Sequence, residues 1–159
     1  MMKIVDAYWE KRNLGVECVE ISIEPTDAVA EIHSRLKDIN APYIVIKVPS
    51  GNMDVMFKLS EWGFVFIESV INVVHDLKDI ELSGIYKRIN TSISYSEMGQ
   101  DDCSQLFTEI QKGMFSTDRV SVDPVFSKDI GARRYVNWIN DEIKKDTKIY
   151  KVYYKNDII

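Results

Sequence analysis

Apolar positions in the first half of the chain alternate between two periods, which predicts strands separated by helices. Residues 16–23 alternate and are rich in β-branched side chains, which is typical of a strand. Apolar residues then recur at spacings of three and four, as in an amphipathic helix; they are Val29, Ile32, Leu36 and Ile39. Asn40 and Pro42 follow, so we expect this helix to end there.

Two more strands are predicted around a second helix. Residues 43–48 are apolar nearly throughout, as in a strand covered on both faces. Residues 50–52 open a helix, and Gly63 suits the position after its end, where φ is usually positive. Residues 64–74 are again apolar and predict a third strand. With right-handed crossovers, this β-α-β-α-β order gives a small, mostly parallel sheet with helices packed on it.

The second half of the chain has a different order. Residues 75–90 are charged and predict a connector, so the boundary between two lobes is expected there. A short strand is predicted at 91–95 and a helix at 101–114, with Asp101 and Asp102 in the first turn, where acids favour the helix dipole.

The last elements predicted are a helix and a hairpin. Asp123-Pro124 is expected to begin the helix, and its apolar stripe is then Ala132, Tyr135, Val136, Ile139 and Ile143. Residues 149–154 predict a strand, and 158–159 begin a returning one. So short a return leaves one side of the strand open, which predicts cover by an earlier strand or by a second chain. We therefore expect a homodimer, strand exchange or a missing carboxyl-terminal half.

Composition narrows the class of protein. The 159 residues are 45% hydrophobic and 28% charged, which suits one globular domain or two small lobes sharing a core. The net charge of −5 gives no basic surplus for a phosphate backbone, so no nucleic-acid partner is expected. No apolar stretch approaches the ~20 residues that cross a bilayer, so we expect no membrane partner and a cytoplasmic location.

Cysteine and histidine give no sign of a metal or redox site. Cys18 and Cys103 lack a CxxC spacing, and His33 and His75 have no partner at ligand spacing. We expect buried or partly buried free thiols and no metal.

Two stretches resemble the GNAT superfamily of N-acetyltransferases. Residues 43–64 are similar to a late strand of that fold, an asparagine-opened helix and a terminal Gly-Phe; the matching positions are Val48, Asn52, Gly63 and Phe64. Residues 114–139 resemble the early paired helices of sugar-nucleotide acetyltransferases of the TDP-fucosamine acetyltransferase type; the matching positions are Arg119, Asp123, Pro124, Tyr135, Trp138 and Ile139. The last seven residues resemble the hairpin tip that precedes the cofactor-binding strand.

The resemblance implies an α/β chain with a GNAT-like mixed sheet flanked by helices. Residues 1–88 would form a GNAT-like β-α-β-α-β lobe, and residues 89–159 the front half of a GNAT domain, with a strand, two helices and a strand. The alternative is one continuous sheet that mimics a permuted GNAT domain. Acetyl-CoA is implied as the family's cofactor, and an amino sugar or similar small amine as its acceptor.

Two departures make catalysis by this chain alone unexpected. GNAT enzymes hold the pyrophosphate on a glycine-rich loop at a helix N-terminus, where backbone amides point at the anion. Residues 24–28, at the corresponding place, contain acids and no glycine, and a second copy of the loop would lie beyond residue 159. The family's general-acid tyrosine corresponds to Leu59, which cannot donate a proton. We therefore expect no catalytic residue, no acetyl-CoA bound by this chain alone, and a lobe without activity.

Four residues are candidates for substrate contact. Arg119 could bind a phosphate or carboxylate with its planar fork, or form a surface or interlobe salt bridge. Asp123 belongs to the same matched pattern. Tyr135 and Trp138, three apart on one helix, could stack on a sugar or pack at a lobe interface. The preceding pair, Arg133 and Arg134, could contact an anion, but we interpret it as solvated helix surface.

Three functions remain open. The chain is the amino-terminal part of an N-acetyltransferase, a non-catalytic GNAT-like binding or regulatory protein, or an enzyme of another class that uses acids such as Asp101, Asp102 and Glu109. Only charge supports the third function, since no His, Cys or Lys stands at a matching spacing.

Overall fold

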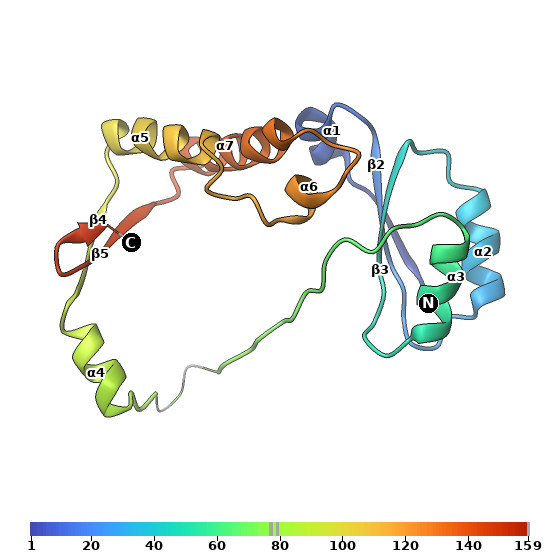
Figure 1. Ribbon diagram of the computed structural model, residues 1–159, viewed down its shortest axis with the longest axis horizontal. Helices are drawn as coiled ribbons and strands as arrows, with labels where there is room; N and C mark the ends of the chain where they lie inside the picture. Colours follow the sequence, from blue (N-terminus) through green and yellow to red (C-terminus); the bar gives the residue numbers. More distant parts are fainter. Residues whose placement is uncertain (77, 79, 159) are drawn as a thin grey trace.

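The chain is a mixed α/β protein with two separate sheets. The computed structural model describes residues 1–76, 78 and 80–158, and those residues form two three-stranded sheets and seven helices (Figure 1). One sheet belongs to the amino-terminal part of the chain and the other to the carboxyl-terminal part, at opposite ends of the molecule. The alternative of one continuous, permuted sheet is therefore wrong for the described residues.

The first lobe is built around a sheet with the order β1-β2-β3. Its elements are β1 (Lys3–Asp6), α1 (Tyr8–Leu14), β2 (Cys18–Ser22), α2 (Val29–Lys37), β3 (Tyr43–Lys47) and α3 (Met53–Glu61). β1 and β2 are antiparallel, whereas β2 and β3 are parallel, with Cys18 beside Tyr43. α2 and α3 cover one face, and their apolar residues form its core; the buried members are Ile21, Ile23, Ile32, Val55 and Leu59.

The second lobe combines an antiparallel sheet with the longer helices. Its elements are α4 (Gly84–Asn90), β4 (Ile93–Glu97), α5 (Gln100–Gln111), α6 (Arg119–Val122), α7 (Lys128–Lys144), β5 (Tyr150–Tyr154) and β6 (Asp157–Ile158). The strand order is β4-β5-β6. β4 pairs with β5 over all its five residues, while β6 pairs only with Tyr153 and Tyr154. The open side expected for the last strand is thus covered by an earlier strand, and Ile159 lies outside the described residues.

A small shared core joins the lobes. Val120 of α6 is fully buried against Ala7, Leu14 and Cys18 of the first lobe. α7 lies beside α1 (Figure 1), and Arg12 of α1 pairs there with Asp141 of α7. Length and composition predicted either one domain or two small lobes sharing a core, and the structure has the second arrangement.

Several predicted elements are confirmed with small shifts. These are β2, α2, β3, α3, β4, α5, α7 and β5. Gly63 has a φ of 90°, the positive value expected after α3. The amino-terminal strand β1 and helix α1, and helix α4 inside the expected connector, were not predicted. Within that connector, residues 77 and 79 lie outside the described residues.

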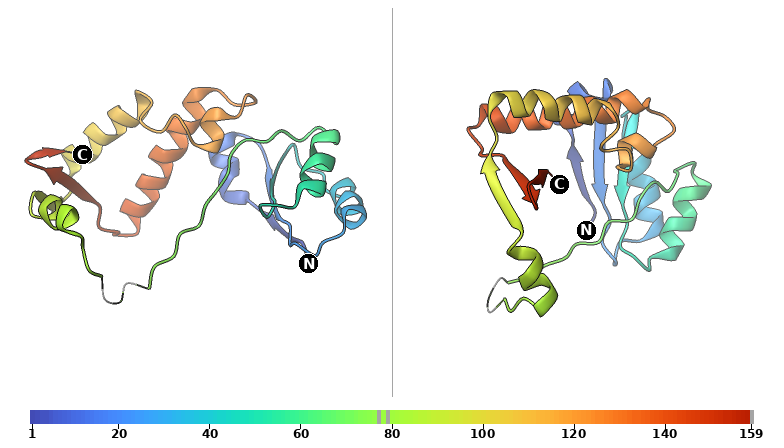
Figure 2. Two further views of the ribbon diagram at one scale, coloured as in Figure 1. Left: turned by 60° about the horizontal axis from the view of Figure 1, so that its bottom comes forward. Right: turned by 60° about the vertical axis from the view of Figure 1, so that its left-hand side comes forward.

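The strand predicted at 64–74 is wrong. These residues form no strand; they run as extended chain from the first lobe towards α4 (Figures 1 and 2). High β propensity measures fit to a pleated surface with neighbours, and no described strand runs beside this segment. Without a neighbouring strand, residues of high β propensity cannot form the backbone hydrogen bonds of a sheet.

The helix start predicted at Pro124 is also wrong. α7 begins at Lys128. The carboxylate of Asp123 accepts the Val125 amide at 2.9 Å, as a capping residue does, and the Phe126 amide donates to the Asp123 carbonyl at 3.2 Å, but these bonds close a single turn that no helix continues. The short helix α6 precedes this turn.

Candidate functional site at the junction of the lobes

Four charged side chains meet between the lobes and form what we call the interlobe cluster: Glu10, Glu20, Arg119 and Arg134. Arg134 donates from Nη2 to Oε1 of Glu10 at 2.6 Å. Its Nε donates to both oxygens of the same carboxylate at 3.0 Å. Arg119 Nη2 donates to Glu10 and to Glu20, each at 3.0 Å. The cluster therefore contains two carboxylates and two guanidiniums, and its formal charges balance.

Local backbone features bring these groups together. Gly15 ends α1 with a φ of 78°, a left-handed value that suits glycine, and lets the chain turn back into β2. Glu10 on α1 and Glu20 on β2 then both reach Arg119. Arg119 is placed by the cap of α6, where Asp118 Oδ1 accepts the amides of Val120 at 2.7 Å and Ser121 at 2.9 Å.

A glycine allows α6 to approach α7 closely. A Cβ on Gly131 would overlap Oγ of Ser121 and lie 3.3 Å from Cβ of Ser121. The same Ser121 hydroxyl donates to the carbonyl of Phe115 at 2.9 Å. Gly131 therefore sets the spacing that lets Arg119 on α6 and Arg134 on α7 share one carboxylate.

The environment of Glu10 has opposing effects on its pKa. Burial raises the pKa, whereas hydrogen bonding and charge from Arg134, the amide of Asn13 and the charge of Arg119 lower it. The lowering effects prevail, so the pKa of Glu10 lies below its ordinary value and its carboxylate is ionised at neutral pH.

Two buried polar atoms beside the cluster have no hydrogen-bond partner among the described residues. They are Oδ2 of Asp118 and Nη1 of Arg119, an acceptor and a donor on adjacent residues. Tyr135 lies beside Asp118: burial raises the pKa of Tyr135, and the charge of the Asp118 carboxylate and hydrogen bonding to it raise that pKa further. Such atoms could bind water or a small polar group at the junction.

Asp123 makes a second polar contact between the lobes. The hydroxyl of Tyr43 on β3 donates to Oδ2 of Asp123 at 2.6 Å. Burial and this carboxylate both raise the pKa of Tyr43 above its ordinary value. The ring of Tyr43 also packs edge-on against Phe126, with centroids 4.8 Å apart. Both carboxylate oxygens of Asp123 therefore accept hydrogen bonds from groups of the same chain.

Aromatic rings line the outer side of the cluster. Phe115 and Tyr135 are stacked with centroids 4.0 Å apart, and Tyr135 meets Trp138 edge-on at 5.6 Å. The guanidinium of Arg134 lies 3.8 Å over the Trp138 ring. Trp138 remains 38% exposed, so one edge of this aromatic row faces solvent.

The four predicted substrate residues lie together at this junction. Arg119 forms an interlobe salt bridge, one of the two alternatives for it, and Tyr135 and Trp138 pack against neighbours there. A substrate role for these residues and Asp123 stays a prediction. The interpretation of residue 134 as solvated surface is wrong, because the Arg134 side chain is 7% exposed.

No pattern in the sequence singles out Glu10, Glu20 or Tyr43. Glu10 lies in an amino-terminal segment without a predicted element, and its partners are more than 100 positions away, at separations of 109 and 124. Only the spacing of Arg134 four residues before Trp138 was a usable signal, since residues at that spacing share a helix face.

The turn before α2 is occupied by its own side chains. Asp27 Oδ2 accepts the backbone amide of Glu24 at 2.8 Å, and Oδ1 lies 3.3 Å from the amino group of Met1. The hydrogen bond from Glu24 and the amino terminus both hold the pKa of Asp27 below its ordinary value, although its partial burial opposes them. A carboxylate held here opposes the approach of a pyrophosphate.

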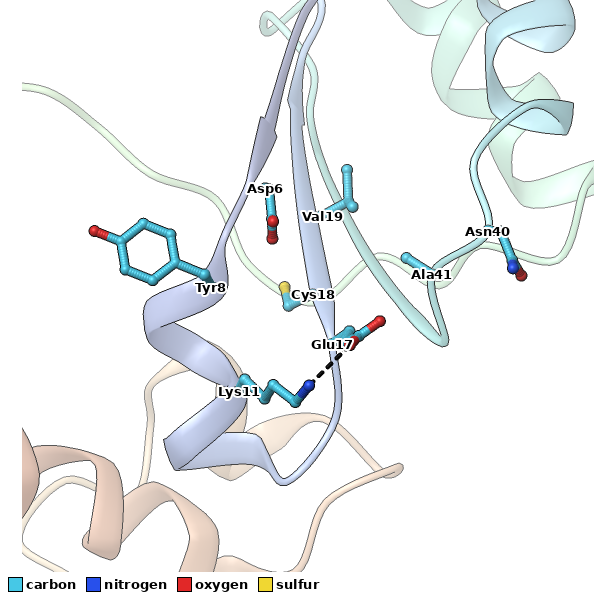
Figure 3. Close-up of a pocket in the computed structure, with 8 residues that line it drawn as sticks. All are labelled: Asp6, Tyr8, Lys11, Glu17, Cys18, Val19, Asn40 and Ala41. Atoms are coloured by element: carbon cyan, nitrogen blue, oxygen red, sulfur yellow. Dashed lines mark hydrogen bonds and ion pairs between the residues drawn. The ribbon is translucent and has the colours of Figure 1, made fainter.

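A pocket of about 420 Å³ opens on the other side of α1 (Figure 3). Its lining includes Tyr8, Cys18 and the exposed side chains of Lys11 and Glu17. Nζ of Lys11 and Oε1 of Glu17 form a salt bridge at 2.8 Å. Burial raises the pKa of the Cys18 thiol to about 11, so it stays protonated at neutral pH. A protonated thiol is a poor nucleophile, and this pocket offers no activated group.

The expectation of free thiols is confirmed, with Cys18 buried and Cys103 partly buried. Among the described residues, no helix combines the length and apolarity needed to span a bilayer. Nor do those residues contain a group of three His, Cys, Asp or Glu side chains placed to hold a metal ion.

Comparisons with known proteins add no family to this picture. Neither a protein-family model, nor a curated protein, nor a solved structure matches the chain.

Proposed function

We propose that this chain is the amino-terminal part of a GNAT-like, acyl-CoA-dependent N-acetyltransferase that acts on an amino sugar or similar small amine, and that it is inactive alone. The observation that carries the proposal is the order of the second lobe. β4 is followed by helices α5 to α7, and β5 then returns antiparallel beside β4 and turns into β6. The resemblance implies a strand, two helices and a strand for the front half of a GNAT domain, and the four-residue helix α6 is an addition to that order.

The first lobe supports the part of the proposal that concerns inactivity. Its parallel pair β2-β3, connected through α2, has the framework of a cofactor-binding unit. The turn that would face a pyrophosphate holds the carboxylate of Asp27, whose Oδ2 already accepts the Glu24 amide. Leu59, in place of a general-acid tyrosine, is 6% exposed and belongs to the core. Acetyl-CoA would then require residues outside this chain.

A titration with acetyl-CoA tests the proposal. We expect no binding to this chain at micromolar concentrations, and acetyl transfer to an amino sugar only when the coding sequence following residue 159 is expressed with it. That sequence is expected to contain a Gly-Phe, a strand and a glycine-rich loop. Micromolar binding by the chain alone contradicts the interpretation of residues 24–28, and a following sequence without those features contradicts the acetyltransferase assignment.

A second candidate is a non-catalytic GNAT-like binding or regulatory protein. The engagement of Arg119 by Glu10 and Glu20 favours it, because the guanidinium offered for a substrate anion already has two carboxylate partners. Absence of acetyl transfer both with and without the following sequence, together with a folded chain, would favour this candidate over the first.

A further inference from the structure

Residues 64–74, which we call the free ribbon, leave the first lobe without pairing to any described strand, although Glu68 passes close enough to Tyr135 of α7 for its charge to raise the pKa of that tyrosine. Phe64 still packs against the first core. Beyond it, six large apolar side chains are 66–91% exposed: Val65, Phe66, Val70, Ile71, Val73 and Val74. Figures 1 and 2 show the segment leaving the first lobe past its sheet and then running towards α4. None of the backbone hydrogen bonds between described residues involves 65–74.

The free ribbon has the composition of a strand that pairs with another strand. It contains no proline or glycine, and Glu68 is its single charge. Apolar β-branched segments with unpaired backbone are templates for strand addition. A row of exposed apolar side chains of this length also marks an interaction surface rather than ordinary scatter.

The order of its side chains is self-complementary. In an antiparallel pair with a twofold axis at Ser69, Phe64 lies opposite Val74 and Val65 opposite Val73, while Ile67 lies opposite Ile71. Residues directly opposite each other point to the same face. One face of such a pair therefore carries Val65, Ile67, Ile71 and Val73 from both copies.

Charge selects this register over its neighbour. An axis at Glu68 would place the two carboxylates directly opposite each other, and like charges in that position are destabilising. An axis between two residues is excluded by geometry, because directly opposite residues point to the same face whereas neighbours along one strand point to opposite faces. With the axis at Ser69, each Glu68 lies opposite Val70, and a serine meets a serine.

Pairing between two copies suits both the backbone and the side chains of the free ribbon. It gives alternate unpaired amides and carbonyls of residues 65–74 partners in the other copy. It also brings Val65, Ile67, Ile71 and Val73 of one copy into cross-strand contact with those of the other. We propose that the free ribbon pairs antiparallel with the free ribbon of a second copy of this chain, on a twofold axis at Ser69. This proposal does not depend on the acetyltransferase assignment.

Cross-linking tests the register. Ser69→Cys in a Cys103→Ser background is expected to form a covalent dimer under mild oxidation, because the twofold axis brings the two thiols together. The matched control is Ser60→Cys in the same background, an exposed position on α3, which is expected to remain monomeric on a non-reducing gel. Equal cross-linking by both variants, or by neither, overturns the register.

Solution mass tests the pairing itself. Pairing of the two ribbons is expected to give a dimer of twice the 18.4 kDa chain mass at ~100 µM. Ile71→Lys is expected to raise the dissociation constant at least ~10-fold, because it places two buried charges in the pair. Ile80→Lys changes an exposed apolar residue that lies outside the free ribbon, so this variant is expected to leave the dimer unchanged.

Other occupants of the free ribbon give distinct results. A monomer at ~100 µM whose 65–74 amides are protected from hydrogen exchange assigns the ribbon to an edge of its own chain and overturns the proposal. A dimer unaffected by Ile71→Lys places the interface elsewhere and also overturns it. Since Ile71 is 85% exposed, the lysine variant is expected to fold.

Discussion

At the residue scale, the carboxylate of Glu10 is both fully buried and negatively charged. Its side chain has no exposed surface, and a buried charge is costly unless it is paired and hydrogen-bonded. Arg134 and Arg119 supply both the pairing and the hydrogen bonds. Removing one member of such a buried group leaves an uncompensated charge, which costs about 3–5 kcal/mol of unfolding free energy.

The stability of the protein is expected to depend on pH through this residue. The folded pKa of Glu10 lies below its unfolded value of 4.5, so its stabilising contribution is complete above about pH 4.5. That contribution is lost as the pH falls through the folded pKa. Urea unfolding at a series of pH values is expected to show a smaller loss below pH 4.5 in Glu10→Gln, alongside a lower stability at neutral pH.

The exposed Glu17 is the control for this experiment. It pairs with Lys11 at the surface, where both side chains are 63% exposed, and such pairs contribute little. Glu17→Gln is therefore expected to keep the wild-type dependence on pH. If Glu10→Gln keeps it as well, the interlobe cluster does not control acid stability.

Tyr43 provides a second prediction at this scale. Tyr43→Phe removes the donor to Oδ2 of Asp123, a carboxylate that is 6% exposed. Leaving a buried acceptor unsatisfied is expected to lower the free energy of unfolding by about 1–3 kcal/mol. Chemical denaturation measures this change. Tyr95→Phe, at a ring that is 73% exposed, is the control and is expected to change stability by less than about 0.5 kcal/mol.

At the scale of elements, periodic patterns predicted helices and strands correctly where the element that each one packs against lies nearby in the sequence. β2, α2, β3 and α3 pack on one another within the first lobe, so local pattern and tertiary contacts agree. The free ribbon has as strong a strand pattern as β3, and yet forms no strand. A strand needs a neighbour, and a neighbour is a property of the tertiary structure or of an assembly.

The crossing of α6 and α7 depends on one small side chain. Gly131→Ala gains about 1 kcal/mol of helix propensity, but its Cβ overlaps Ser121 Oγ, and overpacking costs about 1–3 kcal/mol. We expect a net loss of unfolding free energy, measured by urea denaturation. Gly84→Ala, at the start of α4 with no atom within 4 Å of its Cβ, is expected to be neutral or stabilising.

A double-mutant cycle separates the overlap from other effects. In a Ser121→Ala background the overlapping hydroxyl is gone, so Gly131→Ala is expected to cost less than it does in the natural sequence. An equal cost in both backgrounds would show that the two side chains do not interact.

At the scale of the whole molecule, the two lobes are joined more tightly by contacts than by the chain between them. The described residues of segment 65–83, which we call the linker, cross between the lobes and are exposed except for the half-buried Ile67 (Figure 1). The shared core around Val120 and the interlobe cluster join residues on both sides of it. We therefore expect the two lobes to stay together when the linker is cut.

Cutting the linker tests this conclusion. A protease site inserted after Glu81, which is exposed, is expected to give two fragments that elute together from a sizing column. In an Arg134→Met background the cut fragments are expected to separate more readily, because Glu10 loses its closest partner. Fragments that separate fully in the unaltered background would show that the junction is weaker than its burial indicates.

Sequence by itself determined the α/β class, the main helices and strands, and the absence of glycine from the turn before α2. Those features depend on side-chain periodicity and on residue type, which are local properties. Tertiary structure decided that Arg134 is buried, that Glu10 is its partner, and that residues 64–74 have no strand beside them. Each depends on contacts between positions far apart in the chain, and no local period encodes which distant groups meet.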